Sequence, residues 1–113
     1  MPDDCLFCRI AKKEIPAAIV AENAEFVAFR DINPQAPVHV LAIPRAHVAT
    51  LDAATDAGAL GRLALFAAEV ARKEGIVAQG YRVVANTNAG AGQTVFHLHL
   101  HILGGRAMRW PPG

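Results

Sequence analysis

The feature that most constrains this chain is the run VFHLHLHIL at residues 95–103, where histidine alternates with apolar residues. Alternation is the period of a β-strand, whose successive side chains point to opposite faces of a sheet. A strand here places His97, His99 and His101 on one face and the intervening leucines in the core. A solvated strand face usually carries Lys, Glu, Thr or Ser, so three imidazoles in a row favour a functional site over an exposed polar face.

The spacing of the three histidines limits what kind of site they form. At about 3.3 Å per residue, the Cα atoms of His97 and His101 lie roughly 13 Å apart. Because Zn–N bonds are only about 2.0–2.1 Å long, three ligands on one straight strand do not easily converge on one metal. They can instead line a groove with His99 at its centre, which suits a reaction centre flanked by two supporting groups.

The rest of the chain predicts one α+β domain over residues 1–113. The order of elements is helix, three strands, helix, two strands, and the short links favour an antiparallel sheet of about five strands with the helices on one side. Asp3 or Asp4 is available to cap the first helix. We expect a short helix over 5–14 ended by Pro16, strands over 17–22, 25–30, 38–43, 80–86 and 95–103, and a long helix over 56–74 ended by Gly75. The buried stripe of the long helix is expected at Leu60, Leu63, Ala64, Ala67, Val70 and Ala71.

Composition excludes several classes of partner. A formal net charge of +1, with 6% aromatic residues, argues against a nucleic-acid surface. Mean hydropathy is high at +0.26, but charged residues interrupt every apolar run before the ~18 residues that a membrane span needs. The acidic start MPDDC does not resemble a signal peptide. These features predict a cytoplasmic protein whose apolar excess lies in a core or a subunit interface.

Two short motifs add chemistry to the histidine row. Glycines in the loop 87–94 allow backbone N–H groups to approach an anion, and Thr94 adds a hydroxyl, so a phosphate between this loop and the imidazoles is the economical hypothesis. Cys5 and Cys8 enclose too short a loop for a disulfide to constrain the unfolded chain much. They are half of a metal site, or simply two small buried side chains.

The run 93–103, QTVFHLHLHIL, resembles the signature of the histidine triad (HIT) superfamily, in which three histidines alternate with apolar residues. The stretch 29–47, FRDINPQAPVHVLAIPRAH, and the tail GGRAMRWPPG resemble the Hint branch, the nucleoside phosphoramidate hydrolases. Together these segments cover almost the whole chain. The resemblance implies a HIT-like fold and a homodimer that extends the sheet, with the C-terminal tail reaching toward the partner's site.

The resemblance also implies roles for individual residues. His99 matches the nucleophile, which forms a nucleotidyl-histidine that water then hydrolyses. His101 matches a partner of a phosphate oxygen, and His39 matches a histidine behind the nucleophile that relays protons. In substrate binding, Asp31 matches the ribose ligand; Asn86, Gly92, Gln93, Thr94 and His101 match phosphate ligands; Phe7, Ile10, Ile15, Phe29, Ile32 and Leu41 match the base pocket.

Bacterial members that this chain resembles pair an N-terminal CxxC with two histidines to hold zinc. The matching residues are Cys5, Cys8, His47 and His97. A Cys2His2 set is typical of a closed, structural zinc site, and His97 cannot both bind zinc and shuttle protons. The chain departs from the family at Asn88, where a glycine is common, although Asn tolerates a left-handed backbone better than most residues.

The sequence thus predicts a hydrolase of purine nucleoside 5′-phosphoramidates that needs no cofactor for catalysis. Its partners would be a purine nucleotide or nucleoside phosphoramidate and a second copy of the chain, with no nucleic acid and no membrane. Three alternatives remain open from the sequence. They are a dinucleoside polyphosphate hydrolase, a nucleotide-binding interaction protein with incidental hydrolysis, and a zinc-dependent hydrolase that uses the histidine row.

Overall fold

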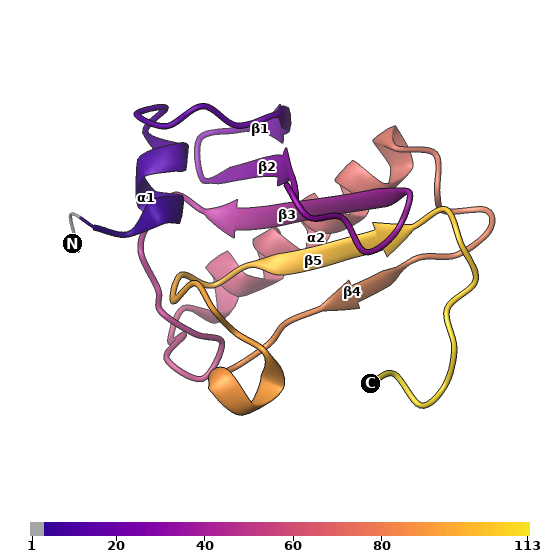
Figure 1. The fold of residues 1–113 in the computed structure, drawn as a ribbon. Helices are drawn as coiled ribbons and strands as arrows, with labels where there is room; N and C mark the ends of the chain where they lie inside the picture. Colours follow the sequence, from indigo (N-terminus) through magenta and orange to yellow (C-terminus); the bar gives the residue numbers. More distant parts are fainter. Residues whose placement is uncertain (1–3) are drawn as a thin grey trace.

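The fold is a five-stranded antiparallel sheet in the order β1-β2-β3-β5-β4, with a helix on each face (Figure 1). The computed structural model describes residues 4–113. The short helix α1 comes first, the long helix α2 follows β3, and a single 3-10 turn, η1, precedes β5. The bounds are α1 Leu6–Ala11, β1 Ile19–Glu22, β2 Phe26–Arg30, β3 Val38–Pro44, α2 Ala57–Lys73, β4 Arg82–Val84, η1 Ala89–Ala91 and β5 Leu100–Gly104.

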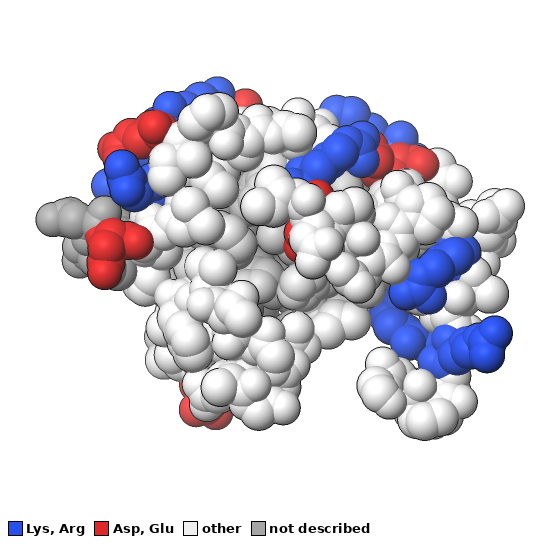
Figure 2. All heavy atoms as spheres, in the orientation of Figure 1, with Lys and Arg blue, Asp and Glu red and all other residues white. Residues whose placement is uncertain are grey.

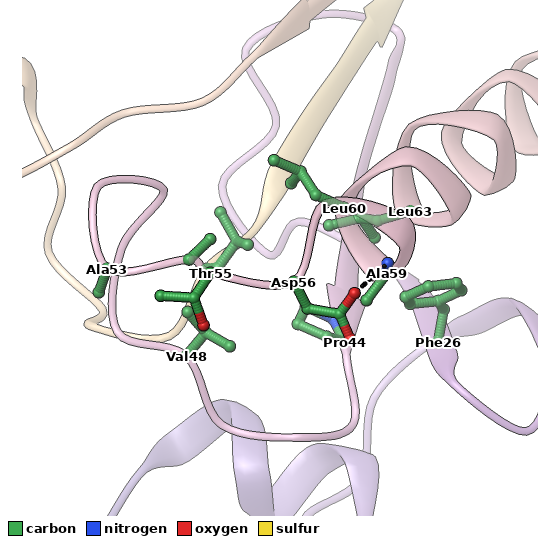
Figure 3. Close-up of a pocket in the computed structure, with 11 residues that line it drawn as sticks. Phe26, Pro44, Val48, Ala53, Thr55, Asp56, Ala59, Leu60 and Leu63 are labelled. Carbon is green, nitrogen blue, oxygen red and sulfur yellow. Dashed lines mark hydrogen bonds between the residues drawn. The ribbon is translucent and has the colours of Figure 1, made fainter.

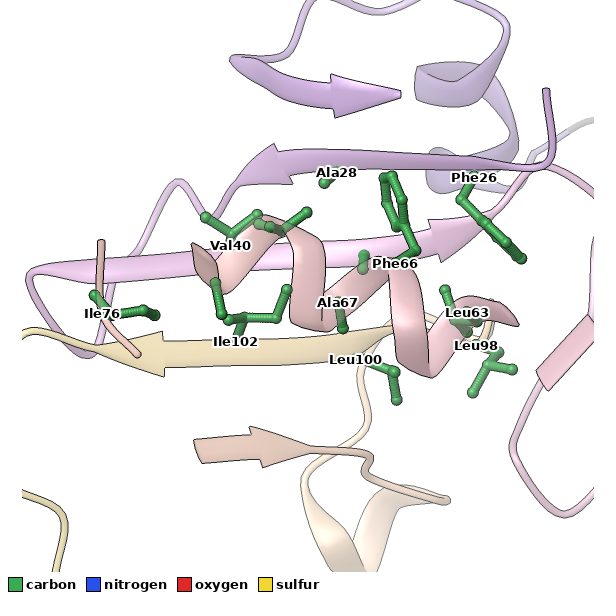
Figure 4. Packing of buried hydrophobic residues seen from close by; sticks show 13 residues of the cluster. Phe26, Ala28, Val40, Leu63, Phe66, Ala67, Ile76, Leu98, Leu100 and Ile102 are labelled. Atoms are coloured by element: carbon green, nitrogen blue, oxygen red, sulfur yellow. The ribbon is translucent and has the colours of Figure 1, made fainter. Parts of the chain in front are cut away.

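The main core lies between the sheet and α2 (Figure 4). Strand residues at every second position, such as Phe26 and Ala28 of β2 and Val40 of β3, point toward the helix, as the period of a strand requires. The helix meets them with Leu63, Phe66, Ala67, Val70 and Ala71. The expected stripe was therefore wrong at one position. Ala64 is exposed, and the ring of Phe66 fills the core instead, 5.5 Å from the ring of Phe26.

The expectation that both helices lie on one side of the sheet was wrong. The alternate residues of the same strands, Val27 and Phe29 of β2 and Leu41 and Ile43 of β3, form a second apolar cluster with Phe7, Ile10 and Ala11 of α1. The two central strands have apolar residues on both faces, so each face buries its residues only if it is covered. The short helix covers the second face at one end and leaves the rest of it open for a site.

The predicted final strand was too long at its start. Pairing with β3 and β4 begins at Leu100, because the backbone N–H of Leu98 donates to the carbonyl of Val48, which lies in the β3–α2 connection. The alternation of side chains nevertheless continues through this segment. Leu98 and Leu100 pack in the α2 core, and the His97 and His99 rings contact the ring of Phe7 from α1.

The helix ends also differ from the sequence prediction. Asp4 is exposed outside α1, and the cap is Cys5, whose Sγ accepts the N–H of Cys8 at 3.4 Å; Asp3 lies outside the described residues. Asp56 caps α2 through the N–H of Ala59 at 3.0 Å. Gly75 follows the C-cap residue and has a positive φ of 72°, the usual glycine position after a helix.

The surface view shows how charge is distributed over one face of the molecule. In Figure 2, lysine, arginine and acidic side chains gather around the margins, and the centre is almost free of charge. Among residues 4–113, no helix combines the length and the apolar character needed to cross a bilayer.

Candidate active site and metal centre

The open part of the α1 face holds a cavity of about 470 Å³, within the size range of small-molecule sites. One wall is apolar and comes from α1 and strands β2 and β3. The other wall carries Asp31, Thr94, His99 and His101. The lining residues are Leu6, Phe7, Ile10, Pro16, Ala17, Ala18, Phe29, Arg30, Asp31, Ile32, Leu41, Thr94, Val95, His99 and His101.

Most of the residues predicted to contact the base are brought together in this cavity. Phe7, Ile10, Phe29 and Leu41 are buried and line it. Ile32 lies at its rim with a fully exposed side chain. The sixth residue predicted there, Ile15, does not line the cavity and packs against the apolar cluster beneath it.

His99 is held in one orientation by its own backbone and by α1. Its Nδ1 lies 2.7 Å from the carbonyl oxygen of His97, and a carbonyl can only accept, so Nδ1 carries the proton. In the neutral ring the lone pair therefore resides on Nε2. The ring of Phe7 meets that of His99 edge to face, with centroids 5.0 Å apart. His99 thus presents a fixed, nucleophilic nitrogen at the wall of the cavity.

A chain of hydrogen bonds fixes the protons of the next two imidazoles. The backbone N–H of Gln35 donates to His39 Nδ1 at 3.0 Å, so neutral His39 carries its proton on Nε2. That nitrogen lies 2.9 Å from His101 Nδ1 and donates to it. His101 then carries its own proton on Nε2, the remaining ring nitrogen. Its ring lies 4.9 Å from that of His99.

Burial keeps this pair of imidazoles neutral in the free protein. Desolvation, with smaller contributions from the neighbouring His99 and His39, lowers the pKa of His101 to about 4. Desolvation also lowers the pKa of His39, which the carboxylate of Asp31 partly opposes. Both rings are therefore uncharged near pH 7, which is the condition under which the tautomers above apply.

Asp31 lies at the point where β2 passes into the 31–37 loop. Its Oδ1 accepts the N–H of Asn33 at 2.8 Å, and its Oδ2 lies 3.4 Å from His39 Nε2. The side chain is 19% exposed and lines the cavity. A carboxylate so placed can accept hydrogen bonds from a polyol at the cavity edge.

The glycine-rich loop contributes one predicted residue to the cavity wall, Thr94. The Gln93 side chain is buried and holds the loop together, since its Oε1 accepts the N–H of Asn88 at 2.7 Å and its Nε2 donates to the carbonyls of Ala49 and Val95. Gly92 has a positive φ of 93°. Neither Gly92 nor the half-buried Asn86 lines the cavity.

Cys5, Cys8, His47 and His97 form a second cluster beside the cavity, with all four donor atoms within 4.8 Å of one another. His97 Nδ1 lies 3.3 Å from Cys5 Sγ, 3.4 Å from Cys8 Sγ and 3.3 Å from His47 Nδ1. Donors bound tetrahedrally to one zinc ion are separated by about 3.3–3.8 Å. The cluster therefore has the composition and spacing of a Cys2His2 zinc site.

The orientation of His97 fits a ligand. Its Nε2 lies 2.7 Å from the carbonyl of Pro44 and donates to it, which leaves Nδ1 unprotonated toward the cluster, the usual arrangement behind a metal-bound histidine. Burial lowers the pKa of His97 to about 4 and raises that of Cys8 to about 11. Neither ring nitrogen of His97 remains for proton transfer in the cavity.

A smaller cavity, of about 120 Å³, lies on the other side of the sheet, at the start of α2 (Figure 3). Its wall is mainly apolar and includes Val48, Leu60, Leu63 and Phe26. The carboxylate of Asp56 is turned toward the helix N–H of Ala59. Histidine and cysteine are absent from the lining, so this cavity offers neither an imidazole nor a thiol for chemistry.

Two groups that orient the histidines were missed from the sequence, namely the backbone N–H of Gln35 and the backbone carbonyl of Pro44. Every residue except proline has the same N–H, and every residue has the same carbonyl, so no residue pattern marks these two. Only the path of the chain before β3 and at the end of β3 reveals them.

Comparison with known proteins agrees with this geometry. The model of the HIT domain family matches residues 12–108. An uncharacterized HIT-like protein of Synechocystis is 56% identical over the full length of both chains. The purine nucleoside phosphoramidase of Escherichia coli is 44% identical over 96% of this chain and 92% of its own. A HIT family hydrolase from Legionella pneumophila superposes with a TM-score of 0.95, at 51% identity, over 97% of this chain and 100% of its own. The chain therefore belongs to the HIT domain family.

Proposed function

We propose that the protein hydrolyses purine nucleoside 5′-phosphoramidates through a nucleotidyl-histidine at His99. The observation that carries this proposal is the hydrogen bond from His99 Nδ1 to the His97 carbonyl. It leaves Nε2 as a nucleophile on the wall of a cavity that also offers Asp31 and an apolar slot. The similarity to the purine nucleoside phosphoramidase of Escherichia coli supports the same chemistry.

In the first step, the lone pair of His99 Nε2 attacks the α-phosphorus and the P–N bond breaks. The leaving nitrogen needs a proton. His101 Nε2–H, which the hydrogen-bond chain through His39 holds toward the substrate, would donate to a phosphoryl oxygen, and the leaving nitrogen would take its proton from solvent. Donors aimed at the phosphoryl oxygens, with Thr94 at the cavity wall among them, would stabilise the charge that develops.

In the second step, water attacks the phosphorus of the nucleotidyl-histidine and the bond to Nε2 breaks. The proton lost by that water is released to solvent and balances the proton taken up in the first step, and His99 returns to its neutral state with Nδ1–H. The products are a nucleoside monophosphate and an amine. Asp31 would bind the ribose hydroxyls, and the apolar part of the cavity beside Phe7 and Phe29 would take the base.

We also propose that Cys5, Cys8, His47 and His97 hold a structural zinc ion. The ion would join α1 to the segments around His47 and His97, and so support Phe7, which lies between the two cysteines in the chain and contacts His99. Because His97 uses both ring nitrogens elsewhere, we assign it to the metal and not to proton transfer.

A homodimer belongs to the same proposal. Within residues 4–113, β4 pairs only with β5 and is an outer strand of the sheet, and Val83 on it is 44% exposed. An outer strand with exposed apolar residues tends to pair with another chain. Light scattering should give twice the chain mass, and a monomer at micromolar concentration would contradict this part.

The test of the proposed function is turnover of adenosine 5′-phosphoramidate by the wild type and by His99→Ala. We expect catalysis by the wild type and a fall of about 10³-fold or more in the variant. Binding of adenosine monophosphate and the circular dichroism spectrum show whether the variant keeps its fold and its pocket. Equal rates would mean that another residue is the nucleophile.

Two further results would favour other functions. Faster turnover of diadenosine triphosphate than of the phosphoramidate would identify a dinucleoside polyphosphate hydrolase. Tight binding of adenosine monophosphate with no turnover of either compound would identify a nucleotide-binding protein. Activity that persists after complete zinc removal from a still-folded protein would exclude a zinc-dependent hydrolase.

A further inference from the structure

The chain that leaves β5 clasps the loop between β2 and β3. Arg106 Nε donates to the backbone carbonyl of Gln35 at 3.1 Å, and Arg106 Nη1 donates to the carbonyl of Ala107 at 3.2 Å. Next to it, Gly105 has a positive φ of 86° and packs so closely that a Cβ on it would lie 2.9 Å from Cβ of Pro37. A hydrogen bond from Arg106 and a close contact of Gly105 therefore join the tail to residues 35–37. We call these two contacts the clasp.

Gln35 depends on this clasp more than the start of the same loop does. Asp31 continues the pairing of β2 with β3, since its N–H donates to the carbonyl of His39 at 3.0 Å. The Gln35 side chain bonds only within the loop, to the carbonyl of Asn33 at 3.0 Å. Among the described residues, the side-chain hydrogen bonds to Gln35 from outside the 31–37 loop come from Arg106 and from His39 itself.

Gln35 in turn sets the tautomer of His39. Its backbone N–H donates to His39 Nδ1 at 3.0 Å. This bond, together with the Asp31 carboxylate 3.4 Å from Nε2, keeps the proton on Nε2, facing His101 Nδ1 at 2.9 Å. If Gln35 moves away, Nδ1 loses its donor and the tautomer with Nδ1–H becomes accessible. His39 Nε2 would then be an acceptor, and His101 could satisfy it only by moving its own proton to Nδ1.

We propose that Arg106 is a positioning residue for catalysis, which holds the Gln35 amide against His39 and thereby keeps the proton of His101 on the nitrogen that faces the substrate. The inference rests on the proposed function for its kinetic consequence, but the tautomers themselves belong to the free protein. Arg106 is exposed and belongs to neither apolar cluster, so its replacement should leave the fold intact.

The direct test is the tautomeric state of His39 and His101, read from long-range ¹H–¹⁵N correlations of the imidazole nitrogens near pH 7.5. In the wild type, Nε2 should be protonated and Nδ1 unprotonated on both His39 and His101. In Arg106→Met, which retains the length of the side chain but has no donor, we expect a mixture of tautomers on both rings. Arg106→Lys retains one donor and should recover part of the wild-type pattern.

Gly105→Ala disturbs the same clasp by a different route, because the added Cβ displaces Pro37. It should shift the tautomer equilibria of His39 and His101 in the same direction as Arg106→Met does. Arg72→Met is the matched control. It removes one exposed arginine from α2, on the opposite face of the sheet, and should leave both tautomers unchanged.

The kinetic test separates a positioning role from a loosened pocket. With adenosine 5′-phosphoramidate, Arg106→Met should lower kcat by about tenfold, since small misplacements of catalytic groups have effects of this order or larger. KM should change by less than about threefold, because Asp31 is held by the strand pairing. A rise in KM at constant kcat would instead indicate general loosening of the loop and would overturn the proposal.

The two proposals fail in different ways. Unchanged tautomers in Arg106→Met would overturn the positioning role, whatever happens to the rate. Protonated Nδ1 on His39 of the wild type would overturn it as well. Absence of turnover by the wild type would contradict the proposed function, and the tautomer measurement would still decide whether Arg106 orders the two imidazoles.

Discussion

His39 Nε2 lies 2.9 Å from His101 Nδ1, across the pairing of β3 with β5. In that register His101 is opposite Leu41 and His39 is opposite Leu103. The two histidines are therefore diagonal neighbours on the same sheet face, at a distance that long side chains can bridge. A shift of one residue would turn one of the two rings into the α2 core.

The buried, neutral histidine pair predicts that acid weakens the fold. The folded-state pKa of His101 is lowered to about 4, below the value of about 6.5 in an unfolded chain. The unfolded chain thus binds the proton more readily. The contribution of His101 to stability is complete above pH 6.5 and is lost as the pH falls toward 4. His39, whose pKa is lowered in the same direction, adds to the loss.

Urea unfolding between pH 7.5 and pH 4.5 measures this effect. The free energy of unfolding should fall by less than about 1 kcal/mol per pH unit on account of His101, after allowance for solvent screening of a partly exposed ring. His101→Gln retains a polar side chain without this titration, so its curve should be flatter over the same range. Identical slopes in the two proteins would contradict the assignment.

The features that recur along the chain could be predicted from the sequence. The partly alternating run 25–30 and the apolar run 38–43, which Pro44 ends, located β2 and β3, and the stripe on α2 placed Leu63, Ala67 and Val70 in the core. The side on which α1 packs was predicted wrongly. The core strands are apolar on both faces, so the pattern did not show which face each helix covers.

In the site, the histidines were visible in the sequence because imidazoles at alternate strand positions are unusual. The groups that decide their protonation were not visible. The amide of Gln35 and the carbonyl of Pro44 act through the backbone, and Arg106 reaches Gln35 from 71 positions away in the chain. Such contacts depend on loop paths, which neither helical nor strand periodicity encodes.

Replacing Asp31 with asparagine should weaken substrate binding more than it slows the chemical steps. Asparagine can still accept the N–H of Asn33 but offers no charge to the ribose hydroxyls, and a hydrogen bond to a charged group contributes about 1.5–3 kcal/mol. We expect KM for adenosine 5′-phosphoramidate to rise by about 10- to 100-fold, measured by steady-state kinetics.

The control for Asp31→Asn is a substrate that lacks the ribose hydroxyls. With the 2′,3′-dideoxy phosphoramidate, wild type and variant should differ by less than about threefold in KM, since the lost interaction is absent from both. Asp52→Asn, an exposed carboxylate on the β3–α2 connection, should behave as the wild type. An equal loss with both substrates would assign Asp31 to loop structure, through Asn33.

Removal of zinc should destabilise the protein, because a ligand that binds only the folded state adds to its stability. Purified wild type should contain about one zinc per chain, and Cys8→Ala should contain little. Saturation at about 1,000 times the dissociation constant adds about 4 kcal/mol, so chelation should lower Tm of the wild type and leave that of Cys8→Ala nearly unchanged. A wild type without zinc, or equal responses to chelation, would contradict the site.

Asn88 should be a place where a glycine stabilises the fold. Its φ is 68° and its ψ is 171°, a region that is costly for any residue with a Cβ and open to glycine. Its side chain makes no capping hydrogen bond, and the bonds to Gln93 use only the backbone of Asn88, so Asn88→Gly preserves them. The relief of strain exceeds the added entropy of the unfolded chain, and the free energy of unfolding should rise by about 0.5–1 kcal/mol. Asn88→Ala, which retains the Cβ, should destabilise the protein in the same urea titration, whereas equal stability of all three proteins would show that this backbone is unstrained.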